Sequence, residues 1–231
     1  MGGHLGPGDR VGGHVKVRLG RWVAWTQAEG PGARAALWVQ GCAIRCPGCV
    51  NPHFWPAQGG SLVEATDLVT VLREGPPVEG VTLLGGEPFE QATALAEFAA
   101  GVRAMDLTVM AFTGYRYEEL QTNPVPGAAD LLAATDLLVD GPYVRTLPDR
   151  RRPWAGSTNQ RFIALTPRYA QLVAEIENPD TEQGSWHDRL EIHLREDGTV
   201  GMSGMSDTRL LGELRRDLGL RHTNGGSGKG P

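Results

Sequence analysis

The stretch "WVQGCAIRCPGCVNP", residues 38–52, holds every cysteine of this 231-residue chain. Cys42, Cys46 and Cys49 follow the spacing C-x3-C-x2-C, and thiolates this close in sequence can converge on one soft metal centre. The simplest alternative is three buried thiols without a function. That alternative is disfavoured because three cysteines are improbable by chance in so short a segment, with glycine and proline between them. The spacing therefore predicts a metal or redox site in this loop.

Three kinds of site compete for these cysteines. A structural zinc site needs four ligands, usually in two separated pairs, and His53 is the nearest candidate for the fourth. A redox dithiol needs only Cys46 and Cys49 and leaves Cys42 unexplained. A 4Fe–4S cluster takes one thiolate per iron, so three cysteines leave one iron open to a substrate or cofactor.

The flanking sequence alternates apolar strands with amphipathic helices, which predicts an α/β fold with a parallel sheet and helical crossovers. A helix is expected to begin at Ser61, because Glu64 three residues later completes a capping-box pattern. Strands are expected in 33–41, 80–86, 107–115 and 137–143, and further helices in 88–105, 117–122 and 129–135.

Each expected strand ends in a glycine-rich or polar motif. These motifs are the cysteine loop, "GGEP" from Gly85, "TGY" from Thr113 and "DGPY" from Asp140. Ligands bind at the carboxyl ends of parallel strands, so the four motifs are expected to meet over one rim. Taken alone, Gly-Gly-Glu-Pro would be a tight turn in which Glu87 caps the next helix.

The stretches "EGPGARAALWVQGCAIRCPGCVNP", "TLLGGEP", "AFTGY", "LLVDGPY" and "WAGSTNQR" resemble, in this order, the radical S-adenosylmethionine (SAM) enzymes. The closest branch is the activating protein of anaerobic ribonucleotide reductase, and the resemblance covers residues 29–166. It implies a partial (β/α) barrel. In this branch an aromatic residue often follows the third cysteine. In this chain Val50 occupies that position, so the aromatic packing contact on the adenine side of the cofactor is not expected.

The resemblance implies that the three cysteines hold three irons of one 4Fe–4S cluster and that S-adenosylmethionine chelates the fourth. The resemblance further implies that reductive cleavage gives a 5′-deoxyadenosyl radical and that the chain would be an oxidoreductase that installs a glycyl radical on a partner. A flavodoxin or ferredoxin would be the electron donor. The matching positions for S-adenosylmethionine are Gly48, Cys49, Val50, Gly85, Gly86, Glu87, Thr113, Gly114, Asp140 and Asn159.

Two other functions stay open at this point. One is a radical SAM enzyme that modifies a small molecule or peptide. The other is a non-catalytic iron–sulfur or metal-binding redox sensor, which would leave "GGEP" and "GSTNQ" without a role. The net charge of −5 argues against nucleic-acid binding. The sequence shows no long apolar run and no signal-peptide pattern, which argues against a membrane-spanning segment and against export. We therefore expect a cytoplasmic protein.

The chain is expected to contain one domain, residues 15–220, between a flexible N-terminus, 1–14, and a disordered tail, 221–231. Its core is about 29–166, and 167–220 form an extension. Within the extension, "RLEIHLREDGTVGMSGMSD" predicts a β-hairpin that turns at Asp197-Gly198, and "TRLLGELRRDLG" predicts a closing helix. The hairpin could cover a sheet edge or serve a partner. The basic segment 148–154, "PDRRRPW", is expected to be a solvated loop.

Overall fold

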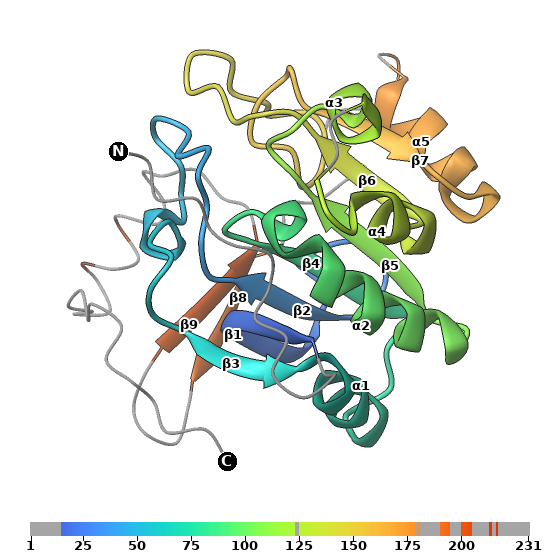
Figure 1. Cartoon of the computed structure of the whole chain (residues 1–231). Helices are drawn as coiled ribbons and strands as arrows, with labels where there is room; N and C mark the ends of the chain where they lie inside the picture. The colour runs from blue at the N-terminus through green and yellow to red at the C-terminus, as the bar shows by residue number, and fades with distance from the viewer. Residues whose placement is uncertain are drawn as a thin grey trace.

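A seven-stranded mixed sheet forms the centre of the molecule, with strand order β3-β1-β2-β4-β5-β6-β7 (Figure 1). The computed structural model describes residues 15–122, 125–178, 180, 190–194, 200–204, 213 and 216. The strands of the sheet are β1 (Lys16–Thr26), β2 (Arg34–Val39), β3 (Ser61–Glu64), β4 (Gly80–Gly85), β5 (Thr108–Phe112), β6 (Leu137–Asp140) and β7 (Arg161–Ala164).

The four central strands β2, β4, β5 and β6 are parallel, and β1, β3 and β7 pair antiparallel at the two sides. Helices connect the parallel strands, as the alternation in the sequence predicts. The helices are α1 (Ala65–Glu74), α2 (Ala92–Ala104), α3 (Tyr117–Thr122), α4 (Ala128–Ala134) and α5 (Ala170–Glu177), with short 3-10 turns at Pro52–Phe54, Pro88–Gln91 and Pro167–Tyr169.

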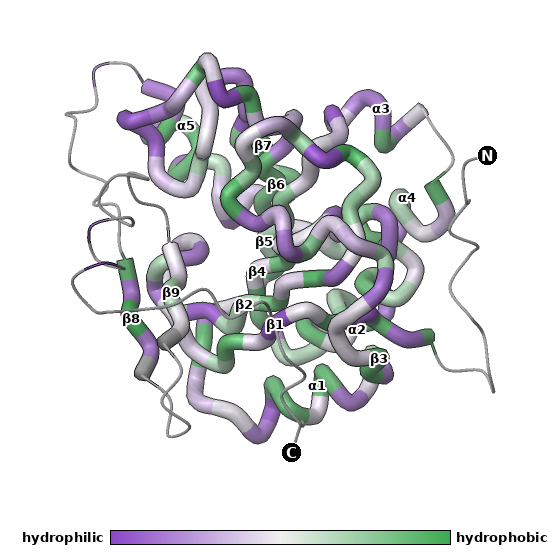
Figure 2. The backbone as a smooth tube through the Cα atoms, turned by 90° about the vertical axis from the view of Figure 1, so that its left-hand side faces the viewer, coloured by the Kyte–Doolittle hydropathy of each residue, from purple (hydrophilic) through white to green (hydrophobic). Residues whose placement is uncertain are grey.

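The sheet is apolar on both faces because helices or loops cover each of them. Val109 and Ala111 of β5 pack into the main core with α1, α2 and α4, whereas Met110 packs on the opposite face with Ile176 of α5. This alternation follows from the two-residue period of a strand. The central strands are accordingly coloured largely as hydrophobic in Figure 2.

Arg34 is a charged residue inside this core. It begins β2, has no exposed surface and donates hydrogen bonds to the hydroxyl groups of Thr82, Thr108 and Tyr169 at 2.8–3.2 Å. It also reaches the carbonyl oxygens of Pro31 and Val81. A buried guanidinium is tolerated only when its donors are satisfied in this way.

The mixed α/β class and the parallel central strands are confirmed, whereas the description as a partial barrel stays a prediction. The predicted helix start at Ser61 was wrong. Residues Ser61–Glu64 form β3, which pairs with Lys16–Leu19 of β1, and α1 begins at Ala65. The ladder that β1 offers outweighs the local capping pattern, and β1 itself was not predicted.

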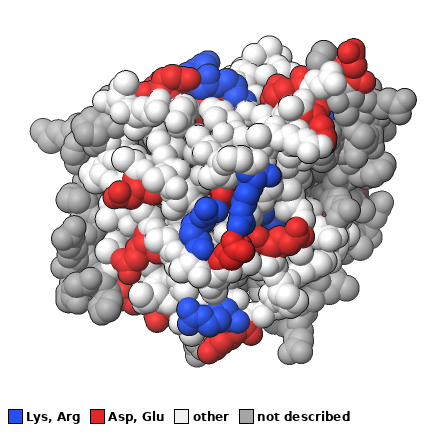
Figure 3. Space-filling model, turned by 90° about the vertical axis from the view of Figure 1, so that its right-hand side faces the viewer, with Lys and Arg blue, Asp and Glu red and all other residues white. Residues whose placement is uncertain are grey.

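The predicted C-terminal hairpin is present as a separate two-stranded sheet of β8 (Leu190–Leu194) and β9 (Val200–Gly204). Its turn at Asp197-Gly198 lies outside the described residues, as do both termini and all of the closing-helix segment except Glu213 and Arg216. No helix among the described residues has the length and apolar character that crossing a membrane requires. On the face in Figure 3, basic and acidic side chains of the described residues lie next to one another.

Candidate active site

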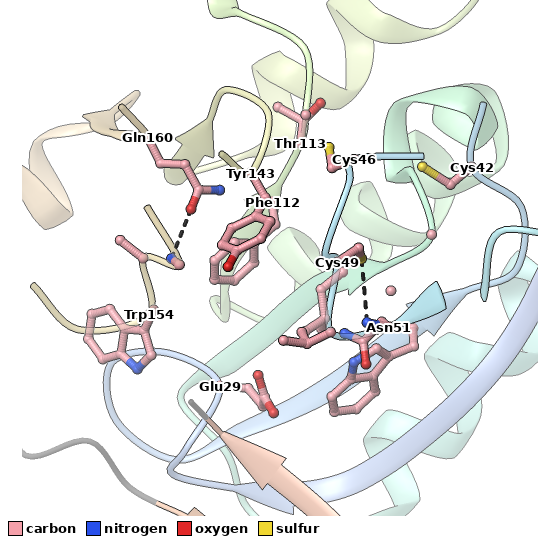
Figure 4. Close-up of a pocket in the computed structure, with 18 of the residues that line it drawn as sticks. Glu29, Cys42, Cys46, Cys49, Asn51, Phe112, Thr113, Tyr143, Trp154 and Gln160 are labelled. Carbon is pink, nitrogen blue, oxygen red and sulfur yellow. Dashed lines mark hydrogen bonds between the residues drawn. The ribbon is translucent and has the colours of Figure 1, made fainter. Parts of the chain in front are cut away.

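A cavity of about 760 Å³ opens at the carboxyl ends of the parallel strands. All four predicted motifs contribute to its wall: Cys42 after β2, Gly86 after β4, Thr113 after β5 and Tyr143 after β6. Figure 4 shows the cysteines, Thr113 and Tyr143 around this space. The prediction that the loops after these strands meet at one rim is therefore confirmed.

The cysteine loop departs from regular structure because its glycines and proline prevent both helix and strand. Gly41 and Gly48 have φ values of 108° and 83°, which favour glycine, and Arg45 also has a positive φ of 51°. Backbone bonds hold the loop in place: Gly41 N donates to Phe54 O at 2.8 Å, and Cys42 N donates to Trp55 O at 3.1 Å. This frame keeps the three cysteines on one side of the loop, toward the cavity.

The three thiols are half-buried, form no disulfide, and all line the cavity. Burial raises the pKa of the Cys42 and Cys46 thiols above the ordinary value. Backbone amides face all three sulfurs: those of Ile44 and Arg45 at Cys42, Tyr143 at Cys46, and Asn51 at Cys49, where N to Sγ is 3.4 Å. Metal binding would have to displace protons from these thiols.

This donor set fits an iron–sulfur cluster better than a single metal ion. Among the described residues, no three Cys, His, Asp or Glu side chains come close enough to hold one ion together. A cluster instead needs thiolates spread around it, one for each iron, and hydrogen bonds to the sulfurs are the usual way in which a protein tunes its potential. The residues therefore fit a three-thiolate cluster.

The "GGEP" loop packs directly against the base of the cysteine loop. A Cβ on Gly86 would lie 2.1 Å from Gly41 O, so only glycine permits this approach. Gly86 N donates to Val39 O and Glu87 N to Gly41 O, both at 2.8 Å. The close packing explains why two glycines precede the glutamate.

Glu87 joins three segments of the rim. Its Oε1 accepts hydrogen bonds from Phe89 N at 3.0 Å and Thr113 Oγ1 at 2.8 Å, and its Oε2 accepts one from Gly114 N at 2.9 Å. The bond from Phe89 N confirms that Glu87 caps the following 3-10 turn. The side chain is only 2% exposed. Burial raises its pKa to about 7, although these three hydrogen bonds act in the opposite direction.

The segment 148–154 is a loop in which Pro148 and Arg150 are exposed, as predicted, but it also forms part of the cavity wall and buries Arg152, which was not predicted. Arg152 is 8% exposed, pairs with Asp149 and Glu177 at 2.6 Å, and also donates to the carbonyl oxygens of Thr158 and Gln160. Trp154 lies on the side of the cavity away from Cys42 in Figure 4. The acidic partners that neutralise this segment come partly from α5, which the local sequence does not reveal.

Seven of the ten residues predicted for S-adenosylmethionine line the cavity, and three do not. Gly48 lies under the side chain of Arg145. Asp140 is buried and bonded to Arg161 and the backbone of Tyr117. Asn159 donates to Pro142 O at 2.7 Å and orders the loop after β6. The lining residues are Cys49, Val50, Gly85, Gly86, Glu87, Thr113 and Gly114.

The cavity also has a wall that the sequence did not predict. It is formed by β1 with the segment after it, by Trp38, and by the C-terminal hairpin. An alternation of polar and apolar residues in 16–26 is the one local signal for β1, and nothing local indicates where the hairpin docks. The lining residues of this wall are Arg21, Glu29, Trp38, Leu190, Met202 and Gly204.

Comparison with known proteins identifies the family. Residues 28–163 match the model of the 4Fe-4S single cluster domain, which includes all three cysteines and the four rim motifs. The chain belongs to this 4Fe-4S domain family. The matched segment ends before α5 and the hairpin.

Relatives of this 4Fe-4S domain protein carry the name anaerobic ribonucleoside-triphosphate reductase-activating protein. The one from Enterobacteria phage T4 is 31% identical over 145 residues, which cover 60% of this chain and 88% of the relative. The relative from Escherichia coli K12 is 30% identical, over 57% of this chain and 88% of the relative. The relative from Vibrio cholerae is 31% identical, over 60% of this chain and 92% of the relative. The predicted resemblance to the activating-protein branch of the radical SAM enzymes is confirmed.

A solved structure, that of QueE from Escherichia coli, resembles the 4Fe-4S domain protein with a TM-score of 0.39 and 21% identity. The likeness covers 44% of this chain and 54% of that chain, about half its length.

Proposed function

We propose that this chain is an activating enzyme that cleaves S-adenosylmethionine reductively and installs a glycyl radical on an anaerobic ribonucleoside-triphosphate reductase. The observation that carries the proposal is the meeting of three free thiols and the Gly86–Glu87 loop in one cavity of a 4Fe-4S domain. The names of the relatives, at 30–31% identity, support the reductase as the target.

Cys42, Cys46 and Cys49 would hold three irons of the cluster and leave the fourth open for the cofactor. When bound, such a cluster supplies the single electron that splits S-adenosylmethionine into methionine and a 5′-deoxyadenosyl radical. The backbone amide of Tyr143 faces the Cys46 sulfur and would favour its thiolate against the burial that disfavours it. Asn51 N donates to Cys49 Sγ at 3.4 Å.

The loop Gly85-Gly86-Glu87, called the GGE loop below, would receive the amino end of S-adenosylmethionine. Gly85 and Gly86 leave the backbone accessible there, and Glu87 lies directly behind them with its carboxyl fixed by three donors. A bound ammonium group would favour the ionised form of Glu87 and lower its pKa from about 7. Glu87 therefore sets the charge of this end of the cavity.

Aromatic and aliphatic side chains would keep water and oxygen away from the reacting atoms. Trp38, Phe112, Trp154 and Leu84 all line the cavity. A radical that abstracts hydrogen also reacts with other molecules that reach it, so the exclusion of water and oxygen is part of the protein's contribution.

The remaining assignments belong to the same proposal. They are the partial-barrel curvature, the single domain over 15–220, an electron donor of the flavodoxin or ferredoxin type, and cofactor contacts from Val50, Thr113 and Gly114. Gly48, Asp140 and Asn159 would act indirectly, through the loops that they order.

The test is radical transfer to the reductase. The chain is reconstituted anaerobically with iron and sulfide, reduced, and mixed with S-adenosylmethionine and the anaerobic reductase of the same organism. We expect the electron paramagnetic resonance doublet of a glycyl radical with the wild type and none with Cys46→Ala. A fully loaded wild-type chain that cleaves the cofactor but leaves the reductase without a radical would refute the reductase as target.

A further inference from the structure

The C-terminal hairpin closes one side of the cavity, although it lies outside the segment shared with the 4Fe-4S family. Leu190 of β8 and Met202 and Gly204 of β9 line the same space as the three cysteines. In Figure 1 the hairpin lies beside β1, and it forms a sheet of its own rather than extending the central one. It therefore does not cover a sheet edge by pairing with it.

Arg21 of β1 fixes one strand of the hairpin. Its Nη1 donates to Met202 O at 2.7 Å and its Nη2 to Ser203 Oγ at 3.0 Å. The guanidinium also stacks over the ring of Trp38, 4.6 Å from the centroid. One side chain thus connects β9, β1 and β2 at the cavity wall.

The segment from the end of β1 to Glu29 binds the hairpin at further points. Thr26 Oγ1 donates to Glu191 Oε2 at 2.5 Å, and Gln27 N donates to Glu191 Oε1 at 2.8 Å. Gly204 N donates to Glu29 Oε1 at 2.6 Å. Contacts of both strands with sites more than 160 residues away indicate a specific docked position.

Within this wall, Trp38 lies against Gly85, whereas the hairpin and Glu29 lie away from the first two cysteines. Figure 4 shows Glu29 beside the hairpin, on the side away from Cys42 and Cys46. The cysteines and the GGE loop line the end where the cofactor would bind, so the hairpin end is left for the group that gives up hydrogen. That group must come within contact distance of the cofactor for the transfer.

The chemistry of this end suits an extended polypeptide segment. Leu190 and Met202 offer apolar contact, and methionine adapts to varied shapes. The buried carboxyl of Glu29 already accepts a hydrogen bond from Gly204 N, and it can accept another from the backbone N–H of a bound segment. Arg21 is engaged with β9 and Trp38, so the wall does not present an open cationic site.

We propose that the β8–β9 hairpin, together with Glu29, forms the subsite that receives the glycine-bearing segment of the partner reductase and so determines which partner is activated. This inference rests on the proposed function and goes further, because it assigns partner recognition to an element beyond the matched 4Fe-4S domain.

Glu191→Ala tests the proposal because it removes two of the docking bonds without changing a residue that lines the cavity. The matched control is Glu97→Ala, which removes the same kind of side chain at an exposed position of α2 outside the cavity lining. A second variant, Met202→Ala, changes the wall itself while leaving the backbone contact of Met202 O with Arg21 possible.

For each reconstituted protein, two quantities are measured: the dissociation constant of the reductase, and 5′-deoxyadenosine formed without reductase. We expect Glu191→Ala to weaken reductase binding about tenfold, the effect of losing one or two hydrogen bonds, and Met202→Ala about threefold. Glu97→Ala should bind like the wild type, and Glu191→Ala and Glu97→Ala should form 5′-deoxyadenosine within about twofold of the wild-type rate.

Equal reductase affinity in the wild type, Glu191→Ala and Met202→Ala would overturn the role of the hairpin while leaving the proposed function intact. A parallel loss of 5′-deoxyadenosine formation and reductase binding in Glu191→Ala would also overturn it, because the hairpin would then support the cavity as a whole. If the wild type forms no 5′-deoxyadenosine at all, the proposed function fails instead, and the reductase dissociation constants still decide the role of the hairpin.

Discussion

Glu87 should make the stability of the ligand-free chain fall as the pH rises toward neutrality. Its carboxyl is 2% exposed, and burial raises its pKa from the ordinary 4.5 to about 7. The protonated form is therefore favoured in the folded state, and the resulting stability is complete below the unfolded pKa. It is lost as the pH rises through about 7, because the folded chain must then ionise a buried acid.

The size of the effect follows from the difference in pKa between the folded and unfolded chains. A rise from 4.5 to about 7 corresponds to roughly 3 kcal/mol of pH-dependent free energy of unfolding. Glu87→Gln abolishes the titration but keeps an acceptor for Phe89 N and Thr113 Oγ1. The side-chain NH₂ group of the glutamine would face Gly114 N, so two donors would meet and the hydrogen bond from Gly114 N would be lost. At pH 5 the variant should therefore be about 1–2 kcal/mol less stable than the wild type.

The assay is urea unfolding of the ligand-free wild type and of Glu87→Gln at several values between pH 5 and pH 8. We expect the free energy of unfolding of the wild type, relative to that of Glu87→Gln, to fall by roughly 3 kcal/mol over this range as Glu87 ionises, so that the variant becomes the more stable protein at pH 8. Glu97→Gln on the exposed side of α2 is the matched control and should follow the wild type. Parallel profiles for wild type and Glu87→Gln would refute the assignment of a neutral-range titration to this carboxyl.

Three further substitutions test other parts of the structure. Arg34→Ala leaves several buried acceptors unpaired, so the free energy of unfolding measured in urea should fall by about 3–5 kcal/mol. Gly86→Ala should lower S-adenosylmethionine affinity in equilibrium dialysis at least about tenfold, because a Cβ would meet Gly41 O at 2.1 Å. Cys46→Ala should change the stability of the metal-free chain by less than about 1 kcal/mol, since the thiol is half-buried, but should lower the iron bound per chain.

Each of these expectations has a definite contrary result. A loss of less than 1 kcal/mol in Arg34→Ala would mean that its hydrogen bonds do not support the core. Unchanged cofactor affinity in Gly86→Ala would mean that the contact between the GGE and cysteine loops is dispensable. Full iron content in Cys46→Ala would exclude Cys46 as a ligand.

The sequence predicts those parts of the molecule that depend on local patterns. The apolar runs of β2, β4, β5 and β6 and the glycines at their ends define the parallel strands and their loops, so the rim could be expected at residue level. Parallel strands place all such loops at one edge of the sheet, which is why four separate motifs led to one cavity.

The errors arise where distant parts of the chain decide the outcome. Ser61–Glu64 carries a helix-start pattern but becomes a strand because β1, more than 35 residues earlier, offers backbone hydrogen bonds. Arg152 carries a surface-like charge but is neutralised by Glu177, 25 residues later. The docking of the hairpin depends on contacts across 164–182 residues, which no local pattern encodes.

The central claim is that Cys42, Cys46 and Cys49 make this cavity a site of reductive S-adenosylmethionine cleavage. The most direct measurement is the amount of 5′-deoxyadenosine formed by the anaerobically reconstituted, reduced chain, with Cys46→Ala beside it. We predict product from the wild type and none from the variant, since the loss of one thiolate removes a cluster ligand. Equal product from both proteins, or none from a wild type that holds a complete and reducible cluster, would contradict this account.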